Sequence, residues 1–243
     1  MVGMIFAAGL GTRLKPLTDT MPKALVPLAG KPLLQWQVEK LRDAGITDII
    51  VNVHHFPDQI IDTIRANNGW GCTIAVSDER DQLLDTGGGL RKALSSVTGN
   101  PSPILACNVD ILSNIDLRAL IAEYNHQSPI TNLQSLLVVS DRQTQRYLCF
   151  DEQDHLCGWT NIKTGEVKGR DGRHLAFSGM QILSPDVLAR LDEMPEGKFS
   201  LIDFYLNVLN EVPLHAYVPS NYRMMDVGKI DQIEEAEAFA ESL

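Results

Sequence analysis

Basic side chains gather on and beside a glycine turn near the start of the chain. Residues 1–38 contain one acid and four bases, namely Arg13, Lys15, Lys23 and Lys31. That segment therefore carries +3 inside a chain of 243 residues whose formal charge is −10. Glycines let the backbone turn tightly and leave N–H groups free to hold phosphate oxygens, and cations at such a turn suit a polyphosphate ligand. Taken alone, the loop fits equally well a glycine turn surrounded by solvated basic residues.

The loop over 8–16 departs from two common nucleotide-binding patterns. It begins like a dinucleotide fingerprint, but Leu14 stands at the third glycine position. The second expected strand ends in Val53 and His54, and not in the acid that would hold a ribose. The P-loop pattern GxxxxGK(S/T) is absent. The sequence thus disfavours a nicotinamide cofactor and an oxidoreductase.

Alternating strand and helix patterns predict an α/β fold with a mostly parallel sheet. Short apolar runs are expected to be strands, at 4–8, 49–53, 72–76, 104–107 and 136–139. Helices are expected between and after them, at 34–45, from 57 onward, at 90–96, around 117–121 and at 230–240. Ligands bind such sheets at the carboxyl ends of the strands, where the loop over 8–16 begins. Turn signals and few helical patterns over 142–183 predict a small antiparallel subregion that covers this end.

Composition excludes several classes of protein. With 44% hydrophobic and 21% charged residues, the chain can form a packed core. A pI near 5.0 argues against a nucleic-acid or membrane-surface partner. No apolar run approaches the roughly 20 residues that span a bilayer, and the N-terminus lacks the basic region of a signal peptide. The four cysteines form no CxxC pair, which indicates reduced thiols in a cytoplasmic protein.

The first 33 residues carry a resemblance to a known family. Gly9, Gly11 and Arg13, then Pro16, then Pro22-Lys23, fill every position of GxGxRxxPxxxxxPK. This pattern is similar to the signature of the sugar-1-phosphate nucleotidylyltransferases, and 26–33 resembles its continuation. The resemblance implies a Rossmann-like three-layer α/β fold of the nucleotide-diphospho-sugar transferase type.

The family's reaction accounts for these residue types. A sugar 1-phosphate oxygen attacks the α-phosphorus of a nucleoside triphosphate (NTP), and pyrophosphate leaves. The nucleophile is already an anion, so catalysis comes from alignment and charge neutralisation. The resemblance implies that Arg13 holds the β- and γ-phosphates and that Lys23 bridges the α-phosphate and the sugar phosphate. It also implies nucleotide contacts from the loop residues Ala8, Gly9, Gly11 and Thr12.

The same resemblance implies Mg²⁺ as the cofactor, held by two aspartates. Asp110 follows the fourth expected strand and resembles the family's metal aspartate, with Val109 where relatives carry glycine. Asp226 resembles the aspartate of the family's late D-(V/I)-G motif. Magnesium prefers one or two carboxylates together with phosphate oxygens and water, which fits this pair.

Three further segments resemble selectivity elements of the family. The run 84–89 contains three glycines and is similar to an (E/D)-T-G-G-G element, so Asp85, Gly87 and Gly88 are expected at the base, with Asn108 near the nucleotide. Gly179 and Asn161 are expected on the sugar side. We expect one domain over 1–243, with 1–141 mainly binding nucleotide, 142–223 mainly binding sugar, and 224–243 carrying a metal aspartate and the closing helix.

The substrate is left open among several pairs. The glycine triplet is typical of the branch containing N-acetylmuramate 1-phosphate uridylyltransferases, which makes UTP with that sugar phosphate the first choice. Mannose or heptose 1-phosphate guanylyl transfer and glucose 1-phosphate thymidylyl or uridylyl transfer are alternatives, and phosphocholine is a further acceptor. A non-catalytic sugar-nucleotide-binding protein is the alternative from another class. The sequence does not indicate an oligomeric state.

Overall fold

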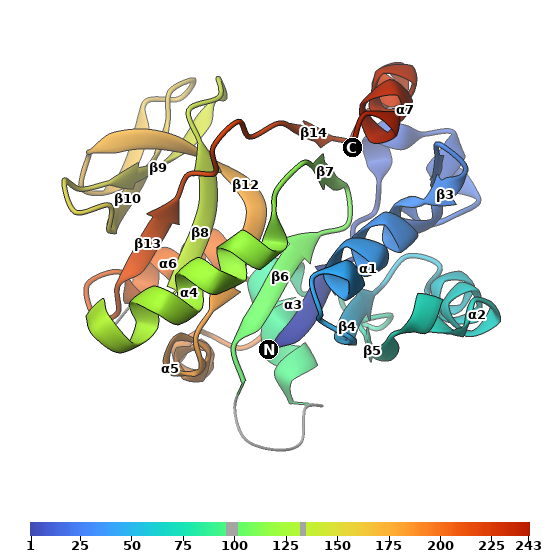
Figure 1. Cartoon of the computed structure of the whole chain (residues 1–243), viewed down its shortest axis with the longest axis horizontal. Coiled ribbons are helices and arrows are strands. Elements are labelled where there is room, and N and C mark those ends of the chain that lie inside the picture. The colour runs from blue at the N-terminus through green and yellow to red at the C-terminus, as the bar shows by residue number, and fades with distance from the viewer. Residues whose placement is uncertain (96–101, 132–134) are drawn as a thin grey trace.

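The computed structural model describes residues 1–95, 102–131 and 135–243, and a ten-stranded sheet runs through it (Figure 1). Four parallel strands form one half, in the order β6 (Ile104–Asn108), β1 (Val2–Phe6), β4 (Asp48–Val53) and β5 (Thr73–Asp78). Apolar residues run almost without interruption along β1, β4 and β6 because both faces of a parallel sheet are covered. The predicted mostly parallel α/β sheet is confirmed, with strand boundaries shifted by up to two residues.

The other half of the sheet is mainly antiparallel and centres on one long strand. β12 (Arg173–Leu183) pairs antiparallel with β6, with β8 (Ser135–Ser140) and with β9 (Arg146–Phe150). β10 (Leu156–Asn161) and β11 (Glu166–Gly169) extend the β9 side, and β13 (Leu214–Tyr217) runs parallel to β8. The antiparallel strands expected within 142–183 are present. β12 joins them to the parallel half.

Helices cover both faces of the sheet, which gives three layers (Figure 1). One face packs against α1 (Leu33–Asp43), α2 (Pro57–Ala66) and α4 (Leu117–Thr131). The other packs against α3 (Asp85–Leu94), α5 (Pro185–Leu188) and α6 (Leu201–Val208). The last helix, α7 (Ile233–Glu241), contacts the short strand β2 (Pro27–Leu28), which pairs with β3 (Lys31–Pro32). Among the described residues, no helix has the length and apolar character needed to span a membrane.

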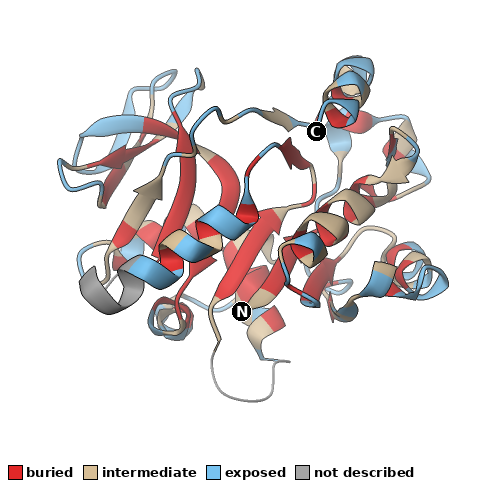
Figure 2. Ribbon diagram, viewed as in Figure 1, coloured by how far each residue is buried: buried red, intermediate tan, exposed pale blue. Residues whose placement is uncertain are grey.

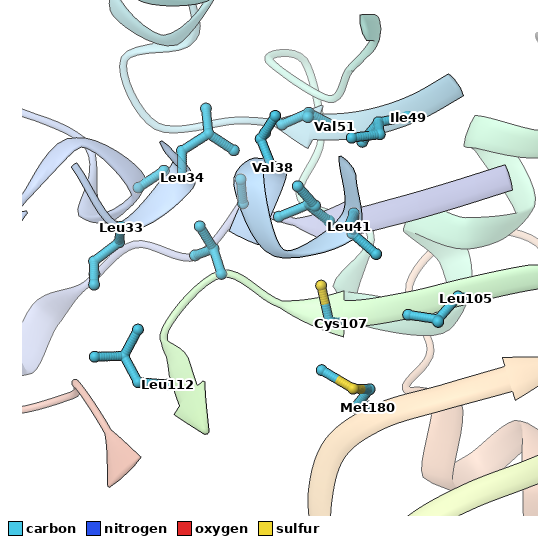
Figure 3. Close-up of a cluster of buried hydrophobic side chains, with 14 of the residues drawn as sticks. Leu33, Leu34, Val38, Leu41, Ile49, Val51, Leu105, Cys107, Leu112 and Met180 are labelled. Carbon is cyan, nitrogen blue, oxygen red and sulfur yellow. The ribbon is translucent and has the colours of Figure 1, made fainter. Parts of the chain in front are cut away.

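The packing of α1 shows how the apolar pattern positions a helix. Leu34, Val38 and Leu41 recur at helical spacing and are buried against β4 and β6 (Figure 3). The helix ends before Gly45, whose φ of 90° is a conformation that glycine adopts readily. Burial colours follow this arrangement, because the sheet is mostly red and the outward sides of the helices are pale blue (Figure 2).

One expected helix begins earlier than its apolar pattern indicates. The helix expected at 90–96 starts at Asp85 as α3 and includes the glycine triplet 87–89. Ser96, at its expected end, lies outside the described residues. Three consecutive glycines lower helix propensity, so only tertiary contacts explain a helix through them. Those contacts come from the segment directly before α6, where the carbonyl of Phe199 accepts two hydrogen bonds from the triplet.

Candidate active site

The loop after β1 turns sharply at a position that requires glycine. Gly11 has a φ of 63°, and its carbonyl accepts a hydrogen bond from Thr18 Oγ1 at 2.8 Å. A Cβ at Gly11 would lie 2.8 Å from Thr18 Cγ2 and 3.0 Å from Lys23 Cβ. Gly11 therefore brings the loop and the segment carrying Lys23 into direct contact.

A cavity of about 400 Å³ opens at this end of the sheet. We call it the larger cavity. Its lining comes from five separate segments: the end of β1 with the loop after it, the Lys23 turn, the start of α3, the end of β6 and the chain after Asp226. The residues are Phe6, Gly9, Leu10, Gly11, Thr12, Arg13, Lys23, Thr86, Asn108, Val109, Asp110 and Gly228. The site residues predicted from the loop after β1 thus meet those predicted after β6.

Lys23 and Asp110 form an ion pair on the wall of the larger cavity, between Lys23 Nζ and Asp110 Oδ2. Lys23 is only 7% exposed. Lysine is seldom buried unless it is paired with an opposite charge, which Asp110 provides here. The short helical turn Lys23–Leu25 places its side chain here after Pro22. The pair holds one ammonium and one carboxylate at the place where a phosphate ligand would lie.

A two-stranded ribbon brings the second aspartate to the first. β7 (Ile111–Ser113) pairs antiparallel with β14 (Met224–Asp226), so that Asp226 lies opposite Ile111. The N–H of Val227 donates to the carbonyl of Asp110 at 2.8 Å. Asp110 and Asp226 are thus neighbours although their numbers differ by 116 (226 minus 110).

The electrostatics of Asp226 show the crowding of negative charge. Burial raises the pKa of the Asp226 carboxyl, and the charge of Asp110 raises it further, while Lys23 and Arg13 act in the opposite direction. Arg13 Nη2 lies 3.8 Å from Asp226 Oδ2, and both side chains are about half exposed. Two carboxylates side by side supply the hard oxygen ligands that Mg²⁺ prefers.

Asn108 and Gly179 lie in direct contact beside this pair. Gly179 has a φ of 68° and lies where β12 shifts register against β8. A Cβ at Gly179 would lie 2.8 Å from Asn108 Nδ2. Val109 is only 4% exposed and belongs to the apolar core.

A second cavity, of about 210 Å³, adjoins the first and shares Phe6, Gly9 and Thr86 with it. We call it the smaller cavity. Its other lining residues are Ala8, Asn52, Leu83, Asp85 and Lys198. The structure therefore brings three predicted nucleotide contacts, Ala8, Gly9 and Asp85, to one cavity.

The glycine triplet serves packing in this structure. The N–H groups of Gly87 and Gly88 both donate to the carbonyl of Phe199, at 3.0 and 3.1 Å. A Cβ at Gly87 would lie 2.4 Å from the Phe199 ring, and one at Gly88 would lie 2.6 Å from the carbonyl oxygen of Gly197. The expectation that the triplet precedes the helix is corrected, because the triplet lies inside α3, while its contact with a base stays a prediction. The segment 197–199 covers it, and neither Gly87 nor Gly88 lines the two cavities.

Replacing Gly88 by alanine tests this packing. We expect Gly88→Ala to lower the free energy of unfolding by about 1–3 kcal/mol, because its methyl group meets backbone that cannot rotate away. Urea denaturation measures the loss. The matched control is Gly9→Ala, whose Cβ would meet no atom within 4 Å and should change stability by less than about 0.5 kcal/mol. Equal stability of the two variants would contradict the packing role.

Asn161 is not brought to the two cavities. It is the last residue of β10, opposite Arg146, and its Oδ1 accepts the N–H of Lys163 at 3.1 Å. This contact closes the turn that leads to β11.

Several lining residues were missed by sequence reasoning. Thr86 and Gly228 lie inside quoted motifs, and a Cβ at Gly228 would lie 2.7 Å from both Arg13 Nη2 and Asp226 Oδ1. For Asn52 the sequence holds one signal of a functional position, because it is an amide within an otherwise apolar strand. Lys198 gave none, because its place depends on how the segment before α6 packs.

Comparison with known proteins identifies the family. A family model described as nucleotidyl transferase matches residues 2–242. N-acetylmuramate alpha-1-phosphate uridylyltransferase of Neisseria meningitidis serogroup B is 31% identical over 240 residues, 99% of this chain and 98% of that protein. The protein of the same name from Caulobacter vibrioides is 31% identical over 84% of this chain and 82% of its own length.

Solved structures agree with this result. HddC from Yersinia pseudotuberculosis, complexed with GMP-PN, is 25% identical with a TM-score of 0.75, and the match covers 99% of this chain and all of that one. A UDP-glucose pyrophosphorylase complexed with UDP-glucose shares the fold with a TM-score of 0.80 at 18% identity, over the whole of both chains. The chain therefore belongs to the nucleotidyl transferase family, among the enzymes that act on sugar 1-phosphates.

Proposed function

We propose that the chain is a Mg²⁺-dependent uridylyltransferase that converts UTP and N-acetylmuramate 1-phosphate into the UDP-sugar and pyrophosphate. The observation that carries the reaction is the ion pair of Lys23 and Asp110 on the wall of the larger cavity, with Asp226 beside Asp110. The two nearly full-length relatives named for that sugar, each 31% identical, support the substrate pair.

In this proposal the chain's own residues align and neutralise phosphates. An oxygen of the sugar phosphate forms a new bond to the α-phosphorus, the bond from that phosphorus to the bridging oxygen breaks, and pyrophosphate departs. Lys23 binds the α-phosphate and the phosphate of the incoming sugar, and Arg13 binds the departing pyrophosphate. Each phosphate group is thus paired with a positively charged side chain. No general base is required, because the attacking oxygen already carries negative charge.

The residues present fit a magnesium ion. Asp110 and Asp226 would hold it, since their oxygens are the donors that Mg²⁺ prefers, and burial together with the charge of Asp110 raises the pKa of Asp226. When bound, the ion would supply charge neutralisation on the phosphates. We place the enzyme in the cytoplasm, where thiols stay reduced, in line with four free cysteines.

A guanylyltransferase is the second candidate. Mannose-1-phosphate guanyltransferase from Debaryomyces hansenii is 36% identical to this chain, but over only 49% of this chain and 33% of that protein. The higher identity is thus confined to a part of the chain. A protein that only binds sugar nucleotides is disfavoured, because binding alone does not require Lys23 paired with Asp110 beside a second carboxylate.

Pyrophosphate release tests these alternatives directly. We would combine UTP, GTP, dTTP and ATP with the 1-phosphates of N-acetylmuramate, mannose, heptose and glucose, with and without Mg²⁺. We expect kcat/KM for UTP with N-acetylmuramate 1-phosphate to exceed every other pair by about a hundredfold, the discrimination that unmade buried hydrogen bonds provide. A preference for GTP with mannose 1-phosphate would overturn the substrate pair, and release with no pair would favour the binding protein.

A further inference from the structure

Glu79 is a buried acid behind the smaller cavity. It directly follows β5 and has no exposed surface, a property that no other acidic side chain shares in the described part of the chain. Burial raises the pKa of its carboxyl, and hydrogen bonds from Asn52 and Leu84 act against that shift. Burying a carboxyl group is costly unless hydrogen bonds compensate, so the partners of Glu79 indicate what it holds in place.

Its two oxygens accept hydrogen bonds from different segments. Asn52 Nδ2, on β4, donates to Oε1 at 2.7 Å, and the N–H of Leu84, in the loop before α3, donates to Oε2 at 3.1 Å. Asn52 Oδ1 in turn accepts the N–H of Ala7 at 2.8 Å. One continuous chain of hydrogen bonds therefore runs from the end of β1 to the loop before α3.

This chain of bonds joins the two walls of the smaller cavity. Ala8 and Gly9, directly after Ala7, form one wall, and Leu83 and Asp85, on either side of Leu84, form the other. Asn52 itself lines the cavity between them. The third glycine of α3 leaves room for the arrangement, because a Cβ at Gly89 would lie 2.6 Å from Glu79 Oε1 and 2.8 Å from Asn52 Nδ2.

We propose that Glu79 is a positioning residue for nucleotide binding: its carboxyl group joins Asn52 to Leu84 and so fixes the separation of the two walls that receive the nucleoside of the NTP. The proposal rests on the proposed function and assigns the nucleoside to the smaller cavity, because the predicted nucleotide contacts Ala8, Gly9 and Asp85 line it. Glu79 lines neither cavity, so it acts through Asn52 and the loop before α3 and not by contact with the substrate.

The bonding pattern explains why glutamine is a poor substitute. Asn52 and Leu84 both present N–H donors, and a glutamine has only one acceptor oxygen for them. Glu79→Gln must therefore leave one buried donor unpaired. Glu79→Asp keeps both acceptor oxygens but is one methylene shorter, so it lengthens at least one of the two hydrogen bonds.

Titration calorimetry with UTP and Mg²⁺, without sugar phosphate, tests the proposal. We expect Glu79→Gln to raise the Kd for UTP about tenfold, equivalent to about 1.4 kcal/mol, and Glu79→Asp to raise it as well. Steady-state kinetics should show the same rise in KM for UTP, with kcat and KM for the sugar 1-phosphate changed less than about twofold. Ile64→Val, a buried residue of α2 that lines neither cavity, controls for a general loss of stability.

Each outcome is decisive. An unchanged Kd for UTP in Glu79→Gln would overturn the proposal, as would an equal rise in Kd in Ile64→Val. If Glu79→Gln does not fold, Glu79→Asp decides instead, since an unchanged Kd for UTP in folded Glu79→Asp would also overturn the proposal. Failure of the wild-type protein to bind UTP would instead refute the proposed function, so the two failures are distinguishable.

Discussion

Lys23→Met is expected to lower kcat/KM for pyrophosphate release by about a hundredfold to a thousandfold, the usual cost of removing one preorganised group from a developing phosphate charge. Methionine keeps most of the length and packing of the lysine and removes only its charge and its hydrogen bonds. The ammonium is held on the wall of the larger cavity by Asp110, so no other cation of the loop after β1 can take its place without moving.

Lys15→Met is the matched control for this prediction. Lys15 belongs to the same loop, but its Nζ pairs with Asp19 at 2.9 Å, both side chains are at least half exposed, and it lines neither cavity. We expect its kcat/KM to stay within about threefold of wild type, since exposed ion pairs contribute little. Circular dichroism would show that both variants fold. Wild-type activity in folded Lys23→Met would show that Lys23 has no role in the reaction.

Much of the sheet was predictable because its signals are local. The strand expected at 49–53 is β4, and Pro57 begins α2 as expected, since apolar runs and a helix-starting proline act over a few residues. Strand order was not predictable. β12 pairs with β6, β8 and β9, and such pairing depends on contacts between residues far apart in sequence.

The candidate site likewise contains residues that the sequence indicates and contacts that only the fold creates. The resemblance of residues 9–23 to a family signature indicated Arg13 and Lys23, and a similar resemblance at the end of a predicted strand indicated Asp110. The meeting of Asp110 with Asp226 required β7 to pair with β14, which no local pattern shows. Glu79 was missed because a glutamate after a strand usually lies at the surface, and only the fold buries it.

The prediction that the glycine triplet lies before the helix was wrong, and helix propensity explains the error. Helix propensity disfavours three glycines in a row, so the apolar pattern alone starts the helix at Leu90. The structure starts α3 at Asp85 because the carbonyl of Phe199 accepts the N–H groups of Gly87 and Gly88. Tertiary contacts with residues more than 100 positions later thus override local propensity.

Asp110→Asn is the second large effect that we expect. An amide keeps the size of the side chain and one hydrogen bond to Lys23, but it removes the negative charge that would hold a divalent ion. The Mg²⁺ concentration for half-maximal rate should rise about tenfold or more, and kcat/KM at a fixed low Mg²⁺ concentration should fall about a hundredfold. Asp226→Asn should act in the same direction, because its carboxylate lies beside that of Asp110.

Binding of Mn²⁺, followed by electron paramagnetic resonance in the presence of UTP, separates the loss of the metal from a loss of chemistry. We expect weaker Mn²⁺ binding in Asp110→Asn and unchanged binding in Asp19→Asn, an exposed acid of the loop after β1 that pairs with Lys15. An unchanged requirement for Mg²⁺ in both Asp110→Asn and Asp226→Asn would place the metal elsewhere. Weaker binding in both variants would instead support a metal site assembled by the β7–β14 ribbon, which brings these two carboxylates together.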